Sequence, residues 1–524
     1  MIRRLFERAF RRNKAPTPTL APTPAETIPV TLTVVPRDQH RISRKQISPN
    51  ALRVLYRLRE AGFAAYLVGG AVRDLLLDGH PKDFDVATDA SPEQVKQQFR
   101  NCRLIGRRFR LAHVHYGQEI IEVATFRGSA DDGSGAMELV DGRIVRDNVY
   151  GSIEDDAVRR DFTVNALYYS VDDFSVRDYV GGFQDINDRV LRLIGDPERR
   201  FREDPVRMLR AARLAAKLEF SIEPTAVAAI GQCKGLLSGA PPARLFDECL
   251  KLFLAGRALA SFRMLVRLGL VDELFPESAR AMRAERSGLA LVEAALDNTD
   301  TRIGADKPVT PAFLFAALMW PAVAAEAASL QAAGEDEPWS LAADSVVSAQ
   351  VARIALPRRF ALPMQEIWLM QERLESMQRR RIGRLLGHPR FRAAFDFLAL
   401  RAIGEPRLRA VVTFWLDLQG EALSAHPIAA QLGGDNDVEG RDEPAGDAPA
   451  QKKRRRRRKP KTAATTESGR PGEAEKLAAM TDQDDGAAPA GGDADAPKKR
   501  RRRRRKPRAD APAAITEPSG GSGE

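Results

Sequence analysis

Two aspartates separated by a single residue, Asp83 and Asp85, are the residues of this sequence whose chemistry is easiest to interpret. In a β-strand both carboxylates would point to one face, and Phe84 between them would point into the core. Two carboxylates on one side repel each other unless a cation joins them, and Mg²⁺ commonly bridges one or two carboxylates to substrate phosphates. The alternative for this tripeptide alone is a solvated strand end.

A glycine pair, Gly69-Gly70, ends 13 residues before Asp83. The pattern predicts a short buried strand at 64–68, a helix that begins at the glycines, and a second strand at 84–87. Glycine lets the backbone approach a ligand closely, and a helix N-terminus presents free N–H groups to an anion, so a triphosphate would fit this turn. A simple tight turn is the alternative for the glycines alone, and the aspartates that follow favour the triphosphate site.

Four segments resemble, in their order along the chain, the motifs of a known family: Gly69–Asp74, Asp83–Asp85, Arg159–Leu167 and Glu203–Arg213. The family is the DNA polymerase beta-like nucleotidyltransferases. The longer context is similar to their class II branch, which contains bacterial poly(A) polymerases and tRNA CCA-adding enzymes. The resemblance runs from about residue 42 to 270 and is less distinct to about 432.

The resemblance implies a metal site and a nucleotide site. Asp83 and Asp85 would hold Mg²⁺ or Mn²⁺, and Glu122 is the best candidate for a third carboxylate because its strand is otherwise apolar. The residues implied to surround the substrate ATP are Gly69, Gly70, Arg73, Arg127 and Arg160 at the triphosphate, and Asp161 and Asn165 at the ribose. For Arg159 and Arg160, a surface ion pair with Asp155 or Asp156 is the alternative.

A polar stripe follows on a predicted helix, where every third residue is charged: Asp204, Arg207, Arg210 and Arg213. The resemblance implies that this helix reads the incoming base. A carboxylate at Asp204 beside a guanidinium at Arg207 would match the donor and acceptor order of adenine and cytosine. Uracil and guanine present the reverse order, which would leave buried polar groups unpaired at roughly 1–3 kcal/mol each. The pair would not by itself exclude cytosine, and Asp204 could also be the N-cap before Pro205.

Three activities remain open for such a chain. Segments 42–48, 104–113 and 119–128 are more similar to the poly(A) polymerase version, which adds AMP from ATP to RNA 3′ ends without a template, releases pyrophosphate and promotes RNA turnover. A tRNA CCA-adding enzyme is the first alternative. Some of these carry a fused phosphohydrolase domain with a His-Asp dipeptide, and none of the six histidines here precedes an aspartate. A catalytically inactive RNA-binding adaptor is the second alternative, which the intact Asp83, Asp85, Asp204 and Arg207 disfavour.

We predict an α+β multidomain chain with a small mixed-sheet nucleotidyltransferase head, an all-helical neck, body and leg region, and disordered terminal segments. Short apolar strands alternate with helices in the first part, and helical periodicity dominates from about residue 205 to 432. The predicted bounds are 1–45 for a disordered basic segment, 46–195 for the catalytic head, 196–260 for the helical neck with the base-recognition motif, 261–433 for the helical RNA-binding body and 434–524 for a disordered arginine-rich tail.

The net charge of +11 is concentrated in two runs of the tail. Lys452–Lys461 has 9 basic residues in 10 and Lys498–Arg508 has 10 in 11, so the rest of the chain has a net charge of −8. Arginine-rich runs bind nucleic acid with a steep salt dependence, although no aromatic residue here could stack on a base. A solubility tail or a docking segment for acidic partners is the alternative.

A cytoplasmic enzyme is expected. The three cysteines form no metal-binding pattern, the basic N-terminus is not followed by an apolar segment, and we expect no stretch near the roughly 20 apolar residues of a membrane span. Residues 1–14 could form a short basic amphipathic helix in weak peripheral contact with a membrane, or be disordered. The expected partners are RNA 3′ ends of mRNA, small RNA and tRNA, with the RNA-decay machinery as a further candidate, and a monomer is expected.

Overall fold

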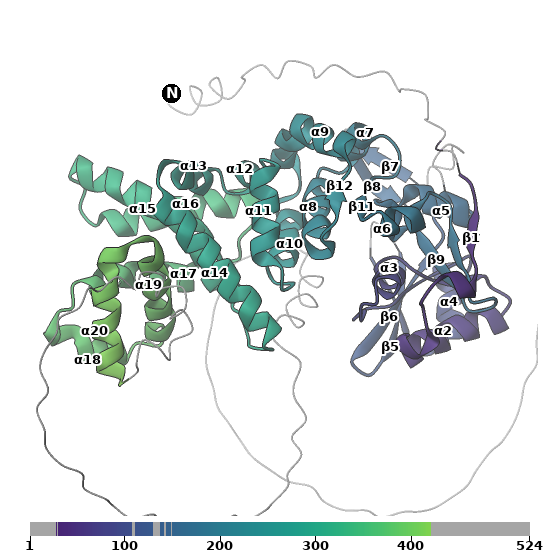
Figure 1. The fold of residues 1–524 in the computed structure, drawn as a ribbon, viewed down its shortest axis with the longest axis horizontal. Coiled ribbons are helices and arrows are strands. Elements are labelled where there is room, and N and C mark those ends of the chain that lie inside the picture. Colours follow the sequence, from purple (N-terminus) through teal and green to yellow (C-terminus); the bar gives the residue numbers. More distant parts are fainter. Residues whose placement is uncertain are drawn as a thin grey trace, which may run out of the picture. The chain divides into compact units, whose positions relative to one another are not determined.

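The computed structural model describes residues 28, 30–106, 110–128, 137–140, 143–147 and 149–420. Figure 1 shows the strands in the purple to blue part of the chain, and helices without strands in the green part that follows. The predicted membrane contact of residues 1–14 and the predicted tail from residue 434 lie outside the described residues.

An eight-stranded mixed sheet forms the head, with the strand order β1-β10-β9-β2-β3-β6-β5-β4. Neighbouring strands pair antiparallel except β3 and β6, which are parallel. The strands are β1 (Thr33–Val35), β2 (Ala65–Val68), β3 (Asp85–Thr88), β4 (Cys102–Ile105), β5 (Leu111–Tyr116), β6 (Glu119–Thr125), β9 (Leu167–Ser170) and β10 (Val176–Asp178). Two smaller pairs are the antiparallel β7 (Met137–Val140) and β8 (Arg143–Asp147) and the parallel β11 (Val190–Leu191) and β12 (Ser221–Ile222).

The two faces of the sheet carry different helices. Successive strand residues point to opposite faces, so Tyr168 and Tyr169 of β9 face different layers. Tyr168 packs in one cluster with Val68 and with Ala157 of α5 (Ile153–Arg159). Tyr169 lines a pocket together with side chains of α2 (Pro49–Glu60) on the other face. Helix α4 (Pro92–Gln98) contacts α2 and therefore lies on the same face as α2.

Local sequence explains the elements next to the glycine pair. The hydroxyl of Ser48 accepts hydrogen bonds at the N-terminus of α2, and Pro49 occupies the first helical position, where its missing N–H is not needed. Gly69 has a φ of +72°, a conformation that strains residues with a side chain, and helix α3 (Gly70–Leu76) begins at the next residue. Strand β2 therefore passes directly into a helix whose N-terminus lies at the end of the sheet.

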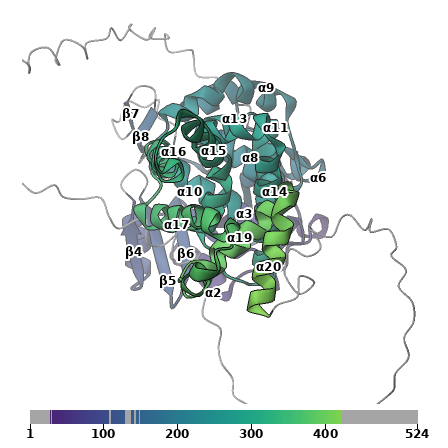
Figure 2. The same ribbon diagram turned by 90° about the vertical axis from the view of Figure 1, so that its left-hand side faces the viewer.

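Helices make up the rest of the described chain. The head also contains α6 (Gly182–Asn187). The neck contains α7 (Pro197–Glu203), α8 (Val206–Leu218), α9 (Pro224–Cys233) and α10 (Pro242–Phe253). The body contains α11 (Ala258–Arg267), α12 (Val271–Leu274), α13 (Pro276–Ala284), α14 (Arg286–Gly304), α15 (Pro311–Ala333), α16 (Pro338–Ile354), α17 (Arg358–Glu375), α18 (Ile382–Leu386), α19 (Phe391–Gly404) and α20 (Arg409–Gln419). Figure 2 shows α15 and α16 side by side, as their contacts require.

Helix α15 corrects one expectation. With 23 residues it is long and apolar enough to cross a membrane by length and composition alone, although no such stretch was expected. Most of its apolar side chains are buried, and α13, α14, α16 and α17 all contact it. Its composition is therefore that of the central helix of the body.

The predicted fold class is confirmed, and two local predictions were wrong. Order begins before residue 45, because β1 pairs with β10 and Ile42 is fully buried. The strand predicted at 84–87 begins at Asp85, so Asp83 lies just before it. Strand β9 begins at Leu167, directly after a 3-10 helix at Thr163–Asn165 and Ala166.

Candidate active site

A cavity of about 350 Å³ opens where β2 ends and α3 begins. It is lined by Gly69, Gly70, Asp85, Arg127, Arg159, Arg160, Asp161, Asn165, Arg200, Asp204, Arg207, Arg210 and Arg244. Seven arginines and three aspartates leave an excess of four positive charges in this lining. Guanidinium groups bind phosphate oxygens in a bidentate manner, so the lining suits a nucleoside triphosphate.

A row of charged residues crosses the sheet beside the cavity. The pairing registers place Asp85 of β3 next to Glu122 of β6, and Glu122 next to His113 of β5. The Nε2 atom of His113 lies 3.5 Å from Oε2 of Glu122. Asp85 as a whole residue is exposed, but desolvation of its carboxyl group and the negative charges of Glu122 and Asp83 together raise its pKa to about 6, against the effect of Arg160.

This arrangement suits a divalent cation that also binds the substrate. The mutual repulsion of Asp83, Asp85 and Glu122 is the electrostatic situation that a cation relieves. Among the described residues, no three His, Cys, Asp or Glu side chains are gathered closely enough to hold a metal ion by themselves. Mg²⁺ usually binds one or two carboxylates and takes its other ligands from water and substrate phosphates. Two carboxylates would suffice for such an ion; Asp85 lines the cavity, whereas Asp83 is exposed just before β3 and does not line it. The roles of Asp83, Asp85 and Glu122 as metal ligands stay predictions.

Arg160 is fixed by a buried network below the cavity. Its guanidinium lies 2.8 Å from Oδ2 of Asp156, which also accepts a hydrogen bond of 2.7 Å from the Tyr168 hydroxyl. Burial alone would raise the pKa of Asp156, but the charge of Arg160 and the bond from Tyr168 lower it. The alternative ion pair considered for Arg160 therefore exists, but it is buried, and Arg160 also lines the cavity.

Asp161 and Asn165 lie together, as expected for a pair that holds a ribose. The Oδ1 atom of Asp161 accepts hydrogen bonds from Asn165 Nδ2 at 3.2 Å and from the backbone of Phe162 at 2.9 Å. Its Oδ2 atom is buried, lies 2.8 Å from Arg210 Nη2 and has no partner with hydrogen-bond geometry among the described residues. This oxygen retains the capacity to accept a hydrogen bond.

Asp204 is held by an arginine that the sequence patterns did not indicate. Arg244 of α10 donates two parallel hydrogen bonds to its carboxylate, at 3.0 Å and 2.8 Å. The Oδ1 atom also accepts from the backbone of Val206 at 3.3 Å, so Asp204 contributes to the start of α8 as well. The carboxylate therefore has a fixed plane at the edge of the cavity.

The arginines of the polar stripe on α8 do not all face the cavity. Arg207 and Arg210 line the cavity, but Arg213 donates a 2.6 Å hydrogen bond to Glu248 of α10. A helix turns 100° per residue, so six residues place Arg213 about 120° around α8 from Arg207. The prediction that Arg213 contributes to base reading is therefore not supported by its position.

Arg73 also differs from its predicted role. Its side chain is 4% exposed and lies outside the cavity lining, where it pairs with Asp74 and donates a 2.5 Å hydrogen bond to Oδ1 of Asn165. It therefore orients Asn165 and does not face the triphosphate site directly.

Three lining arginines were not among the predicted site residues: Arg159, Arg200 and Arg244. Burial and the nearby charge of Arg207 lower the pKa of Arg200 to about 10. Arg200 immediately precedes the Glu203–Arg213 motif, which is the one signal that could have indicated it. Arg244 lies 40 residues beyond Asp204 in an ordinary helix, and only the fold brings the two together.

A backbone clasp supports the cavity beside Arg127. Gly128 donates to the carbonyl of Val149 at 2.9 Å, and Gly151 donates to that of Phe126 at 3.0 Å. A Cβ on Gly151 would collide with Gly128, so the two chains approach as closely as glycine allows. Arg159 donates a short hydrogen bond to the Gly128 carbonyl.

Comparisons with known proteins agree with this geometry. Three family models match the chain. Residues 65–192 match "Poly A polymerase head domain". Residues 219–282 match "Probable RNA and SrmB- binding site of polymerase A", and residues 333–461 match "Polymerase A arginine-rich C-terminus". The chain is 50% identical to Poly(A) polymerase I of Escherichia coli O6:H1 over 402 aligned residues. The aligned region covers 75% of this chain and 86% of that protein. The chain belongs to the bacterial poly(A) polymerase family.

Further relatives separate this family from its neighbour. Poly(A) polymerase I of Haemophilus influenzae is 45% identical over 378 residues, or 70% of this chain and 84% of that protein. The CCA-adding enzyme of Bacillus subtilis is 39% identical over 225 residues, or 43% of this chain and 55% of that enzyme. A solved tRNA nucleotidyltransferase, complexed with a primer tRNA and an incoming ATP analog, shares the fold, with a TM-score of 0.50 and 22% identity over 70% of this chain and 98% of that chain. The polymerase is thus a polynucleotide adenylyltransferase, and the CCA-adding alternative fits less well.

The Arg244–Asp204 contact gives a first prediction for the polymerase. Hydrogen bonds to charged groups contribute about 1.5–3 kcal/mol, so Arg244→Gln should raise the KM for ATP at least about tenfold by freeing the Asp204 carboxylate. Initial rates against ATP concentration measure this. Arg257→Gln, at an exposed pair with Glu219 in the same region, is the control and should change KM little. An unchanged KM in Arg244→Gln would show that the orientation of Asp204 does not matter.

Proposed function

We propose that the cavity is the ATP site from which the chain adds AMP units to RNA 3′ ends without a template, releasing pyrophosphate. One observation supports this most directly. The Gly69-Gly70 turn, Asp85 and the pair Asp204 and Arg207 all line the same cavity, although they are separated by up to 138 residues. A phosphate cradle, a metal-binding carboxylate and a base reader are thereby available to a single nucleotide.

Each part of the lining has a proposed role. The glycine turn and the N-terminus of α3 contact the triphosphate, and Arg127 and Arg160 offset its charge. Asp161 and Asn165 accept and donate hydrogen bonds at the ribose hydroxyls. Asp204 accepts a hydrogen bond from the adenine amino group and Arg207 donates to a ring nitrogen, so the base is read without a template.

Asp83 and Asp85 would hold the divalent cation. When bound, such a cation supplies Lewis-acid stabilisation of the attacking RNA 3′ hydroxyl and of the leaving pyrophosphate. The protein holds the Asp85 carboxylate at the cavity wall and orients the triphosphate, so the hydroxyl can attack the α-phosphorus in line. The guanidinium groups offset the negative charge that develops on the phosphate oxygens.

The raised pKa of Asp85 predicts a pH dependence. The ionised carboxylate is the form that binds the cation, and the pKa is about 6 without the cation. At low Mg²⁺, kcat/KM should therefore fall about tenfold for each pH unit below about 6. A higher Mg²⁺ concentration should shift the midpoint of this pH profile to lower pH, because the cation competes with the proton for the Asp85 carboxylate. Rates measured between pH 5 and 8 at two Mg²⁺ concentrations test this. A midpoint that is the same at both Mg²⁺ concentrations would contradict it.

The activity itself is tested by incorporation of labelled ATP and CTP, separately and with Mg²⁺, into a generic RNA and into a tRNA that ends in CC. Long extension of the generic RNA with ATP alone is the expected result. Short additions of both nucleotides, confined to the tRNA, would instead establish a CCA-adding enzyme and overturn the proposal.

The arginine-rich tail is proposed to hold RNA electrostatically. Deletion of the residues after Gly434 removes both basic runs, so RNA affinity and processivity should fall while basal ATP incorporation persists. Binding of labelled RNA at several salt concentrations and the length of the products measure the two effects. A truncated but folded chain without basal incorporation would contradict this separation of roles.

We also propose a cytoplasmic location and a monomer that acts on the 3′ ends of mRNA, small RNA and tRNA. The three cysteines are buried and unpaired, which fits a reducing compartment. The RNA-decay machinery and a membrane contact of residues 1–14 are further proposals, which rest on the sequence alone.

A further inference from the structure

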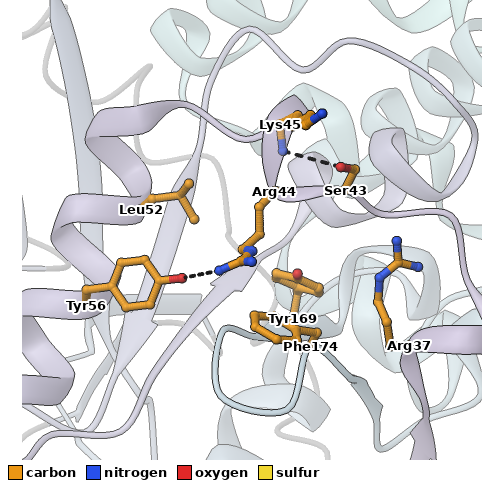
Figure 3. A pocket seen from close by; sticks show the side chains of 8 residues that line it. All are labelled: Arg37, Ser43, Arg44, Lys45, Leu52, Tyr56, Tyr169 and Phe174. Atoms are coloured by element: carbon orange, nitrogen blue, oxygen red, sulfur yellow. Dashed lines mark hydrogen bonds between the residues drawn. The ribbon is translucent and has the colours of Figure 1, made fainter.

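A second pocket of about 490 Å³ lies on the opposite face of the head. It is lined by Arg37, Ser43, Arg44, Lys45, Leu52, Tyr56, Tyr169 and Phe174 (Figure 3). Tyr168 bonds Arg160 of the ATP cavity, whereas the next residue, Tyr169, lines this second pocket, so β9 separates the two.

Three cationic side chains, those of Arg37, Arg44 and Lys45, gather around this pocket. Among the described residues, no carboxylate lies within ion-pair distance of Arg37, Arg44 or Lys45. Nearby Arg41 and Arg59, by contrast, pair with Asp78 and Asp172. Three cations around one hollow, none of them in an ion pair with a described carboxylate, favour the binding of an anion.

Aromatic groups hold one of these cations in place. The Arg44 guanidinium lies 4.5 Å from the centre of the Phe174 ring and donates a 3.2 Å hydrogen bond to the Tyr56 hydroxyl. Figure 3 shows it extending between Tyr56 and the rings of Tyr169 and Phe174, with Arg37 on another side of the pocket. Nucleic-acid bases stack on guanidinium planes and aromatic rings, so this wall suits a planar base.

The loop that carries Phe174 has a strained backbone. Phe174 has a φ of +57°, which is unfavourable for a bulky side chain. Its carbonyl is fixed 2.8 Å from Nε2 of His40, and Asp173 caps the loop through Ser175 Oγ at 2.8 Å. Such strain tends to be retained where a side chain has a functional position.

We propose that this pocket binds a nucleotide unit of single-stranded RNA, with the phosphate at Arg37 and Lys45 and the base against Arg44 and Phe174. The proposal rests on RNA being the substrate of the proposed function. The bound unit is not the one being extended, because the ATP cavity lies on the other face of the sheet. The pocket would hold an upstream part of the RNA.

The test is binding of a labelled oligo(A) to the full chain without ATP. The double variant Arg37→Gln/Lys45→Gln should weaken binding about tenfold and reduce the salt slope by about 0.7 for each phosphate that is no longer neutralised. Arg53→Gln is the matched control, because Arg53 is exposed on α2, bonds only Asn50 in the hydrogen bonds of the described residues and does not line the pocket. Both changes are on exposed side chains, and equal melting temperatures would confirm intact folding.

The outcomes separate the pocket from general surface charge and from the proposed function. Equal losses in the double variant and in Arg53→Gln, or no loss in either, would overturn the pocket in favour of general surface charge. Displacement of the RNA by AMP in the wild type, but not in the double variant, would keep the nucleotide chemistry and assign the pocket to a free nucleotide. The KM for ATP should be the same in all variants at saturating RNA. Wild-type protein that binds oligo(A) but does not extend it would refute the proposed function and leave the pocket standing.

Discussion

Asp85→Asn should reduce ATP incorporation at least about 10³-fold while making the folded protein more stable at neutral pH. The activity falls because the proposed cation loses a charged ligand, and Lewis-acid stabilisation contributes several kcal/mol, at about 1.36 kcal/mol for each factor of ten. The stability rises because the ionised Asp85 is unfavourable in the fold, which raises its pKa from 3.8 to about 6. Incorporation assays and urea unfolding in EDTA measure the two effects.

The pH dependence of the stability has a definite sign. Between about pH 4 and 6 the folded state binds more protons at Asp85 than the unfolded state does. The free energy of unfolding of the wild type should therefore fall as the pH rises through this window, and the difference from Asp85→Asn should appear above it. Asp89→Asn, in the turn after β3, is the control for activity. A destabilised Asp85→Asn variant would mean that lost activity reflects lost folding.

Arg160→Met should lower the free energy of unfolding by about 3–5 kcal/mol and also weaken ATP binding. Asp156 is 3% exposed, and removal of its partner takes away the strongest opposite charge and leaves the buried carboxylate with only the weaker effect of Arg127. The bond from Tyr168 remains, but it is neutral. Urea unfolding at neutral pH measures the loss.

Two further variants separate the effect of the buried Asp156 charge from the general effect of removing an arginine. In Asp156→Asn/Arg160→Met the uncompensated charge is absent, so part of the stability should return while ATP binding stays weak. Arg202→Met removes an arginine from an exposed pair with Glu198 and should cost at most about 1 kcal/mol. If Arg160→Met were as mild as Arg202→Met, the Asp156 network would not carry the stability assigned to it.

Sequence patterns identified the parts of the site that are local motifs. Gly69-Gly70, Asp85 and Asn165 line the cavity as expected, because short motifs define both a turn or strand and the residue that it presents. Periodicity did not reveal where a charged side chain points or which group it contacts. Arg213 points away from the cavity and donates a hydrogen bond to Glu248, and Arg73 contacts Asp74 and Asn165.

The failures elsewhere have a tertiary cause. Arg244 sits in an amphipathic helix with no unusual pattern, and its role exists only because α10 packs on α8. Residues 30–45 lack apolar periodicity, but the three residues of β1 are stabilised by pairing with β10, as Thr33 opposite Asp178 shows. The mixed sheet and the helical body follow from strong periodicity over long segments, which is why the fold class was predicted correctly.

The glycine clasp between Gly128 and Gly151 has a consequence for how this protein can change. Both ends of the excursion that contains β7 and β8 are fixed by backbone hydrogen bonds at Phe126 and Val149, so the length of chain between them does not enter the geometry of the cavity. Longer closed loops cost little additional entropy. The excursion is therefore a place where insertions should be tolerated in evolution, and where a reporter domain could be grafted without disturbing Arg127.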